Sequence, residues 1–176
     1  MCWSRENYNK PSQFLIDNSE LLPSGKALDI AMGSGRNTLY LAERGLEVEG
    51  DDISRENIQQ ALNRAQEHSL KINARVADIE GDAYRIKKDA YDLIICFNYL
   101  YRPLIPMIKE GLRKGGIVIY ETYLVEQADY GKPKNPAYLL KHNELLDMFR
   151  DLRCLRYREG MIAGRGFVAG LVAEKE

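Results

Sequence analysis

The stretch KALDIAMGSGRNTLYLAERG, residues 26–45, decides the fold class of this chain. A short apolar run, Lys26–Ile30, leads into the turn Gly33–Gly35, and a helical pattern begins at Arg36. The two glycines can adopt backbone conformations that other residues resist, and they carry no side chain. A ligand could lie against bare main chain here, beside the N–H groups of the helix start and the carboxylate of Asp29. The alternative is a tight strand-to-helix connection that binds nothing.

The composition indicates one globular domain spanning residues 1–176. The chain is 45% hydrophobic, which is typical of a protein with a packed core. Its 25 basic and 26 acidic residues give a net charge of −1, which favours neither nucleic acid nor an anionic membrane as a partner. Three cysteines form no CxxC pair, and no apolar run has the length of a signal peptide or membrane span. We therefore expect a cytoplasmic protein with reduced thiols.

Short apolar runs alternate with helical patterns along the chain. Strands are predicted at 26–30, 46–51, 72–77, 92–97 and 117–120, helices at 36–44, after 54, at 104–113 and at 143–150, and a hairpin at 152–158 and 167–173. Gly115 and Gly116 are predicted to end the 104–113 helix, and Ile58, Ala61, Leu62 and Ala65 are predicted to form the apolar face of the helix that follows Ser54. This order indicates an α/β fold with a doubly wound, mostly parallel sheet and helices on both faces. Such sheets bind ligands where the winding reverses, and the turn at 31–37 is expected there.

Two further acids narrow the ligand. Asp52 ends the second predicted strand, nineteen residues after Gly33, which fits the roughly 20-residue spacing of nucleotide-binding sheets. Asp78 ends the third. A dinucleotide would want a third glycine where Thr38 stands, and Asp29 would repel its pyrophosphate. S-adenosylmethionine has no phosphate, and acids for its ammonium, ribose and adenine amine suit it better.

At this point the chain resembles the small class I S-adenosylmethionine-dependent methyltransferases of the tellurite-resistance and thiopurine-methyltransferase-like type. Residues 28–37 match the first motif, with Ala31 in place of a glycine. Residues 50–54, 77–79, 96–100 and 112–116 match later motifs in order, with Lys114 in place of a proline. The resemblance implies a Rossmann-like sheet of seven strands whose last strand is antiparallel, in agreement with the terminal hairpin.

The resemblance also implies S-adenosyl-L-methionine as cofactor and S-adenosylhomocysteine as product. The cofactor site is then expected to comprise Asp29, Ala31, Gly33, Ser34, Gly35, Arg36, Asn37, Asp52, Ile53, Asp78, Ile79 and Phe97. One feature fits poorly: Glu47, Glu49 and Asp51 alternate on one face of a strand that should be apolar. Either that strand lies near solvent, or Asp51 competes with its neighbour for the ribose.

The acceptor side is expected to follow the fourth and fifth strands. Methyl transfer is an in-line displacement, for which the nucleophile must lie roughly 3–3.5 Å from the methyl carbon and water must be excluded. The candidate catalytic residues are Asn98 and Glu121, the candidate substrate contacts are Tyr99, Tyr101, Arg102 and Tyr123, and no metal site is predicted. The long segment 122–141 is predicted to be a lid, or else a surface loop packed by its own tyrosines. Residues 1–24 are expected to form a helical cap, in which Trp3–Phe14 could fold over the site.

These patterns predict a methyltransferase that acts on a small-molecule acceptor, as a monomer or homodimer without nucleic acid or membrane partners. Two alternatives stay open. One is a nicotinamide-dependent oxidoreductase, and the other is a non-catalytic protein that binds the cofactor and serves in an interaction.

Overall fold

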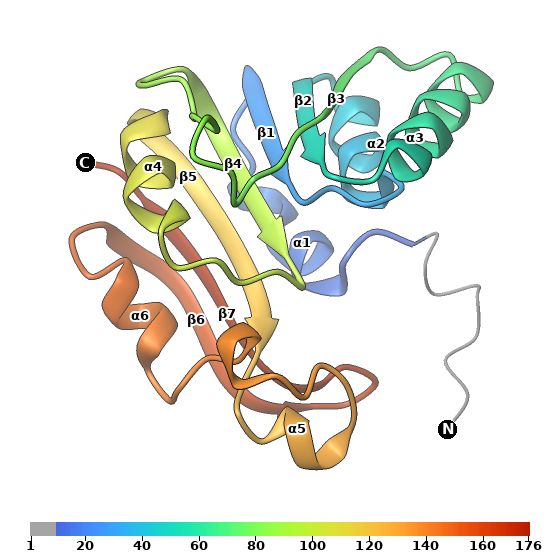
Figure 1. Cartoon of the computed structure of the whole chain (residues 1–176). Coiled ribbons are helices and arrows are strands. Elements are labelled where there is room, and N and C mark those ends of the chain that lie inside the picture. Colours follow the sequence, from blue (N-terminus) through green and yellow to red (C-terminus); the bar gives the residue numbers. More distant parts are fainter. Residues whose placement is uncertain (1–9) are drawn as a thin grey trace.

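A seven-stranded mixed sheet with helices on both faces forms the protein, as seen in a computed structural model that describes residues 10–176 (Figure 1). The strands lie in the order β3-β2-β1-β4-β5-β7-β6; β1 to β5 are parallel, and β7 is antiparallel to both its neighbours. This confirms the predicted fold class. The elements are α1 (Gln13–Asp17), η2 (Ser19–Leu21), β1 (Lys26–Ile30), α2 (Arg36–Glu43), β2 (Glu47–Asp52), α3 (Arg55–Glu67), β3 (Ile72–Val76), β4 (Tyr91–Phe97), α4 (Leu104–Gly111), β5 (Leu112–Tyr123), α5 (Gln127–Tyr130), η3 (Pro136–Tyr138), α6 (Glu144–Met148), β6 (Arg153–Ile162) and β7 (Gly166–Glu174).

The winding of the sheet reverses between β1 and β4. The chain moves outward from β1 through β2 to β3, then crosses back so that β4 pairs with the other side of β1. The carboxyl ends of β1 and β4 therefore lie next to each other with their following loops diverging, which leaves the space where doubly wound sheets bind ligands.

Strand β4 explains why its sequence is apolar without interruption. Leu93 and Ile95 belong to the core cluster that includes residues of α1 and α2, whereas Ile94 and Cys96 belong to the cluster that includes residues of α4 and α6. Successive side chains of a strand point to opposite faces, so a strand covered on both faces has no polar position to spare. The prediction of a doubly covered strand is confirmed.

The acids on the charged face of β2 are divided between solvent and internal ion pairs: the side chain of Glu47 is 76% exposed, as expected of a strand near solvent, whereas Asp51 is not. Asp51 is fully buried, and Arg75 of β3 donates to both of its oxygens, with Nε to Oδ1 at 2.9 Å and Nη2 to Oδ2 at 3.0 Å. The hydroxyl of Tyr84 also donates to Asp51 Oδ2, at 2.8 Å. The Asp51 carboxylate is therefore part of an internal ion pair, and its complete burial keeps it from a ribose.

Glu49 is held in the same way, two residues earlier on the same face of β2. Lys26 of β1 forms an ion pair with its carboxylate at 2.6 Å, and the Tyr91 hydroxyl donates to it at 2.6 Å. The segment between β3 and β4 contains no helix, so this part of the sheet is covered only by a loop and by tyrosines. Acids can face that side because each finds a cation and a phenol there.

Two sequence-based expectations are corrected. Helix α4 ends at Gly111, and Gly115 and Gly116 lie inside β5, not at a helix end. The reason is that these glycines pair with the C-terminal residues: Gly115 N donates to Lys175 O at 2.6 Å, and Lys175 N donates to Gly116 O at 2.9 Å. On α3, Leu62 is 36% exposed, because Ile58, Ala61 and Ala65 already form the buried face.

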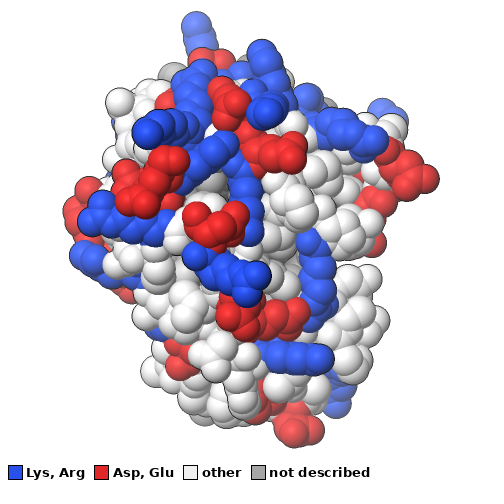
Figure 2. All heavy atoms as spheres, turned by 90° about the vertical axis from the view of Figure 1, so that its left-hand side faces the viewer, with Lys and Arg blue, Asp and Glu red and all other residues white. Residues whose placement is uncertain are grey.

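The face that carries α4 and α6 is evenly charged. Figure 2 shows Lys and Arg side chains interspersed with Asp and Glu over it, with no large region of one sign. Several of these charges are paired, as Lys109 is with Asp151 and Lys175 is with Asp89. Within residues 10–176, every helix is too short or too polar to cross a bilayer.

Replacing Arg75 with alanine tests the ion pair on β2. The change leaves the buried Asp51 carboxylate with only the Tyr84 hydroxyl, and we expect the free energy of unfolding to fall by about 1–3 kcal/mol in urea titrations. Asn73→Ala, an exposed position on the same strand, is the control and should change it by less than about 0.5 kcal/mol. Equal losses in both variants would show that the pair contributes nothing specific.

Candidate functional site

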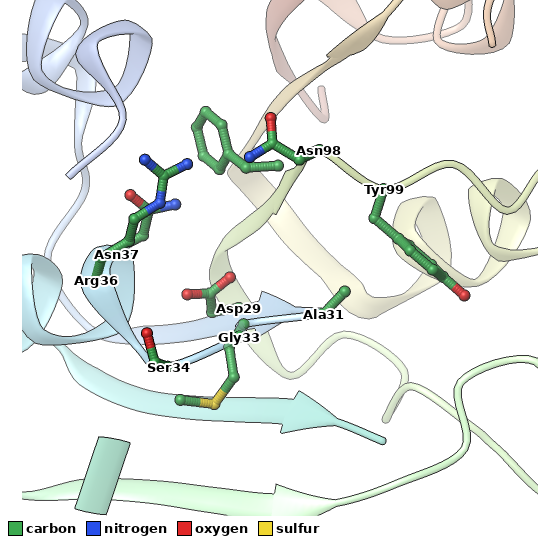
Figure 3. A pocket seen from close by; sticks show the side chains of 10 residues that line it. Asp29, Ala31, Gly33, Ser34, Arg36, Asn37, Asn98 and Tyr99 are labelled. Carbon is green, nitrogen blue, oxygen red and sulfur yellow. The ribbon is translucent and has the colours of Figure 1, made fainter. Parts of the chain in front are cut away.

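A cavity of about 300 Å³ opens at the reversal point of the sheet (Figure 3). Its walls come from the β1–α2 turn and from the end of β4. In Figure 3 the Asp29 carboxylate lies between Arg36 and Asn37, from the start of α2, and Asn98, from the end of β4. The residues that line the cavity are Asp29, Ala31, Met32, Gly33, Ser34, Arg36, Asn37, Phe97, Asn98 and Tyr99.

Left-handed backbone conformations alternate through the β1–α2 turn. Ala31, Gly33 and Gly35 have φ angles of 54°, 57° and 83°. Glycine adopts this region freely, whereas an alanine there costs roughly 1–2 kcal/mol. A Cβ built on Gly33 would meet no protein atom within 4 Å, so the turn presents open main chain to the cavity. The sequence pattern predicts such exposed main chain at Gly33–Gly35, and we call this turn, with Asp52, the cofactor cradle.

Asp52 holds this turn in place. Its Oδ2 accepts the N–H of Gly33 at 2.8 Å, and its Oδ1 accepts from Ser54 N at 2.9 Å and from Asn57 Nδ2 at 3.2 Å. A carboxylate offers about four acceptor positions, so roughly one remains for a ligand. The Gly33 amide, which a phosphate would use, is already bound to a negative charge. The turn is therefore suited to a ligand without phosphate.

Asp29 supplies the second negative group, at the floor of the cavity. It is 2% exposed, and the hydroxyl of Thr38 donates to its Oδ2 at 2.7 Å. Burial raises the pKa of Asp29 to about 7, while the hydrogen bond from Thr38 and the charge of Arg36 oppose that rise. A carboxylate in this state gains most from a cationic ligand, which would restore its charged form.

The first two residues of α2 connect the cavity to the N-terminal segment. Arg36 Nη1 donates to Lys10 O at 3.2 Å, and Asn37 Oδ1 accepts from Ser12 N at 2.8 Å. The predicted contribution of Trp3 lies outside the described residues. Phe14, the other end of the predicted cover, packs in the core against Gly170 of β7 and so does not reach over the cavity.

A buried acid and two arginines lie beside the end of β4. Glu121 is fully buried at the end of β5; its Oε2 accepts from Arg158 Nη2 at 2.6 Å and its Oε1 from Arg165 Nη2 at 2.9 Å. Arg165 also donates to Asn98 Oδ1 at 2.6 Å and to the Tyr123 hydroxyl at 3.3 Å. Both oxygens of Glu121 accept hydrogen bonds from these arginines, so Glu121 anchors the two guanidinium groups.

Sequence reasoning missed these two arginines. They lie in β6 and in the β6–β7 loop, 37 and 44 residues after Glu121. A signal was present, because an acid at the end of a central strand must be paired when it is buried. Its partners could not be chosen among the many arginines of the chain without the antiparallel register of the hairpin.

The remaining predicted residues are divided between the cavity and its surroundings. Phe97 and Tyr99 line the cavity, and the Tyr99 hydroxyl donates to Glu80 at 2.8 Å across its edge. Ile53 is 68% exposed beside Asp52, whereas Ile79 is buried. Asp78 lies in a second, more open hollow of about 680 Å³, and its Oδ1 accepts from Glu80 N.

Two residues predicted on the acceptor side have other contacts. Tyr101 packs against the core beneath α4 and α6. The guanidinium of Arg102 is engaged with Glu144, at 2.6 Å, and with the carbonyls of Ala137 and Leu139, both at 3.0 Å. Arg102 therefore fastens the segment that follows β5 and does not line the cavity.

That segment, predicted as a lid, is attached at both ends. Val125 N donates to Leu140 O, which joins its start to its end, and the buried Gln127 binds the Phe167 amide and the Lys132 carbonyl. Exposed tyrosines lie between these attachments, at Tyr130 and Tyr138. Closure over the cavity stays a prediction, restricted now to the part between the attachments.

Comparison with known proteins gives a consistent family. A family model described as "Tellurite resistance protein TehB" matches residues 5–165. A curated protein of Haemophilus influenzae, "Probable S-adenosyl-L-methionine-dependent methyltransferase TehB", is 28% identical over 154 residues, which are 84% of this chain and 52% of that protein. The "Ubiquinone biosynthesis O-methyltransferase" of Coxiella burnetii is 32% identical over 114 residues, 61% of this chain and 47% of that protein. The chain thus spans about half the length of the curated relatives it matches.

Solved structures confirm the fold. The crystal structure of TehB from Haemophilus influenzae superimposes with a TM-score of 0.81 at 24% identity, over 97% of this chain and 65% of that one. A geranyl diphosphate C-methyltransferase from Streptomyces coelicolor, crystallised with Mg²⁺, geranyl diphosphate and S-adenosyl-L-homocysteine, has a TM-score of 0.70 at 17% identity, over 93% and 79% of the two chains.

The raised pKa of Asp29 makes a prediction about stability. Its folded pKa of about 7 lies above the unfolded value near 3.9, so its charge destabilises the fold progressively as the pH rises between these values. Asp29→Asn removes that cost and should raise the free energy of unfolding by roughly 1–3 kcal/mol at pH 8, with little change near pH 4. Urea titrations at the two pH values measure this. The exposed Asp82→Asn is the control, and an equal effect of Asp29→Asn at both pH values would contradict the assignment.

Proposed function

We propose that this chain, which belongs to the tellurite resistance protein TehB family, moves a methyl group from S-adenosylmethionine to a small-molecule acceptor by in-line displacement. The observation that carries the proposal is the glycine turn whose own amide is bound by Asp52 and whose floor is the buried carboxylate of Asp29. Open main chain beside two acids fits a ligand that is cationic and free of phosphate. The bound cofactor would supply a methyl group made electrophilic by its sulfonium.

The residues of the cavity divide the cofactor between them. We assign the ammonium group to Asp29 and the carboxylate to Arg36, since these are the buried anion and the cation that line the cavity. Asp52 accepts a ribose hydroxyl in its remaining position. The exposed side chain of Ile53 and the backbone near Ile79 receive the adenine, with Asp78 beside its amine. The roles proposed for Asp52 and for residues 78 and 79 agree with the resemblance seen in the sequence.

The same geometry argues against a nicotinamide cofactor. A pyrophosphate placed on the turn would meet the Asp52 carboxylate at the Gly33 amide and the Asp29 carboxylate below it. Thr38 also occupies the position of the third glycine, and its hydroxyl is used by Asp29. Each contact would cost a dinucleotide part of the binding that helix N-termini usually provide.

The acceptor is proposed to be a small anion. Arg158 pairs with both Glu121 and Asp17, the latter at 4.0 Å, which leaves Arg165, hydrogen-bonded to Glu121 and to Asn98, as the cation of this cluster that lies beside the cavity. An anionic nucleophile has its lone pair available and needs no general base, which suits a site in which Glu121 is already occupied. Arg165 would hold the acceptor in line with the methyl group, and Tyr123 and Phe97 would limit the access of water. The family description makes tellurite the first acceptor to test, with selenite as its chemical analogue.

Gly33→Ala tests the cofactor site with a matched control. The added methyl group has no protein neighbour within 4 Å and enters the space that the cofactor would occupy. Gly45→Ala introduces the same left-handed strain, at φ 85°, in equally open space at the far end of α2. In calorimetry with S-adenosylhomocysteine, we expect Gly33→Ala to weaken binding more than about tenfold and Gly45→Ala less than about twofold, since each 1.4 kcal/mol is tenfold.

The same calorimetry, repeated with NAD, tests the oxidoreductase alternative. Binding of NAD with an affinity comparable to that of S-adenosylhomocysteine would support the oxidoreductase. Equal affinities of the two glycine variants would contradict the placement of the cofactor on the turn.

Arg165→Gln tests the acceptor side. The variant keeps a hydrogen-bond donor but removes the charge, while Arg158 continues to pair with Glu121. We expect cofactor affinity to change by less than about twofold and turnover with selenite or tellurite to fall at least about tenfold, as for a lost charged hydrogen bond. Arg156→Gln, an exposed arginine of β6, is the control. Full turnover by Arg165→Gln would remove the arginine from the proposed mechanism, and turnover with neutral thiols alone would contradict an anionic acceptor.

A further inference from the structure

Helix α3 runs alongside the glycine turn and contacts it through three residues on one face. Asn57, Ala61 and Arg64 are spaced i, i+4 and i+7, so their side chains project from the same side of the helix. Each of them contacts a different part of the cofactor cradle. None lines the cavity itself.

The first contact passes through Asp52. Asn57 Nδ2 donates to Asp52 Oδ1 at 3.2 Å, while the other oxygen of that carboxylate holds the Gly33 amide. The backbone N–H of Asn57 donates to the N-cap residue, to Ser54 Oγ at 3.2 Å, which fixes Asn57 in the first turn of the helix. Asn57 therefore fixes the orientation of the carboxylate from the helix side.

The other two contacts reach the turn directly. Arg64 Nη1 donates to the carbonyl of Ser34 at 3.1 Å, across 30 residues of sequence. A Cβ built on Gly35 would lie 2.8 Å from the Cβ of Ala61, so the turn rests on that alanine without room for a larger residue. Helix α3 thus contacts the Ser34 carbonyl and Gly35 directly, and the Gly33 amide through Asp52.

The turn needs such support because its own backbone does not define it. Glycines lose the most conformational freedom on ordering, and the turn alternates left-handed residues at 31, 33 and 35. Its internal hydrogen bond joins Gly35 N to Met32 O at 3.1 Å, and Met32 N is tied to Asp51 O at 3.0 Å. The Ser34 carbonyl, at the tip, is held by Arg64. A tip that is ordered before binding does not have to be ordered by the ligand.

We propose that Asn57 and Arg64 are positioning residues that preorganise the glycine turn and thereby set the affinity for the cofactor; this inference rests on the proposed function. Both side chains are partly exposed, so water can replace their hydrogen bonds in the variants at little cost to the fold as a whole. Water cannot, however, hold the Ser34 carbonyl and the Asp52 carboxylate in one fixed position as these two side chains do. Loss of either residue is expected to act on cofactor binding and not on global stability.

The test compares α3 variants on its two faces. Arg64→Ala and Asn57→Ala remove the contacts, Arg64→Lys keeps a cationic donor, and Asn63→Ala changes an exposed position of the same helix. In calorimetry with S-adenosylhomocysteine we expect Arg64→Ala and Asn57→Ala to bind about three- to tenfold more weakly, the fold-change of one net hydrogen bond. Arg64→Lys should recover part of the loss, and Asn63→Ala should bind like the natural protein. Turnover at saturating cofactor should be unchanged, so that the effect appears in KM.

Hydrogen exchange without ligand gives the second readout. The amides of residues 33–35 should exchange faster in Arg64→Ala than in the natural protein, while those of β4 exchange alike in both. Unchanged exchange in the turn, or affinities that match the natural protein, would overturn the inference. An equal loss in Asn63→Ala would overturn it too, because that result indicates a weakened helix. If the natural protein itself fails to bind S-adenosylhomocysteine, the proposed function is contradicted, and the exchange comparison still decides whether α3 orders the turn.

Discussion

The hydrogen bond from the Gly33 amide to the Asp52 carboxylate is the contact on which the rest of the site depends. It joins the turn after β1 to the end of β2. The same carboxylate accepts hydrogen bonds from Ser54 and Asn57 at the start of α3. One side chain therefore fixes the positions of two loops and a helix. It also places negative charge beside the amide that would otherwise attract an anion.

The grouping of residues around the glycine turn could be predicted from the sequence because its determinants are local. The turn, the acid at the end of β2 and the Ser54 cap lie within 26 residues of one another, and their spacing follows from the geometry of a strand, a turn and a helix. The apolar run of β4 was informative for the same reason. The alternation of side chains and the extent of burial can be inferred from each short segment by itself.

The surroundings of Glu121 could not be predicted in this way. Glu121 was recognised as a candidate, but Arg158 and Arg165 come from a hairpin whose register with β5 is set by long-range pairing. The acids of β2 present the same difficulty. Whether Asp51 faces a ligand, solvent or an arginine depends on the absence of a helix between β3 and β4, and on Arg75 in an adjacent strand. The extent of β5 was also underestimated, because its glycines pair with the last residues of the chain.

The insertion of β7 between β5 and β6 has a consequence for how this protein can change over time. The glycine turn and Asp52 belong to the β1–α3 part of the chain, whereas Arg158 and Arg165 belong to a terminal hairpin that closes through its own loop. Substitutions near Arg165 can therefore alter the surroundings of Asn98, which lines the cavity, without passing through the glycine turn. A sheet built in this order lets the chemistry on one side of the cavity vary while the turn on the other side keeps its geometry.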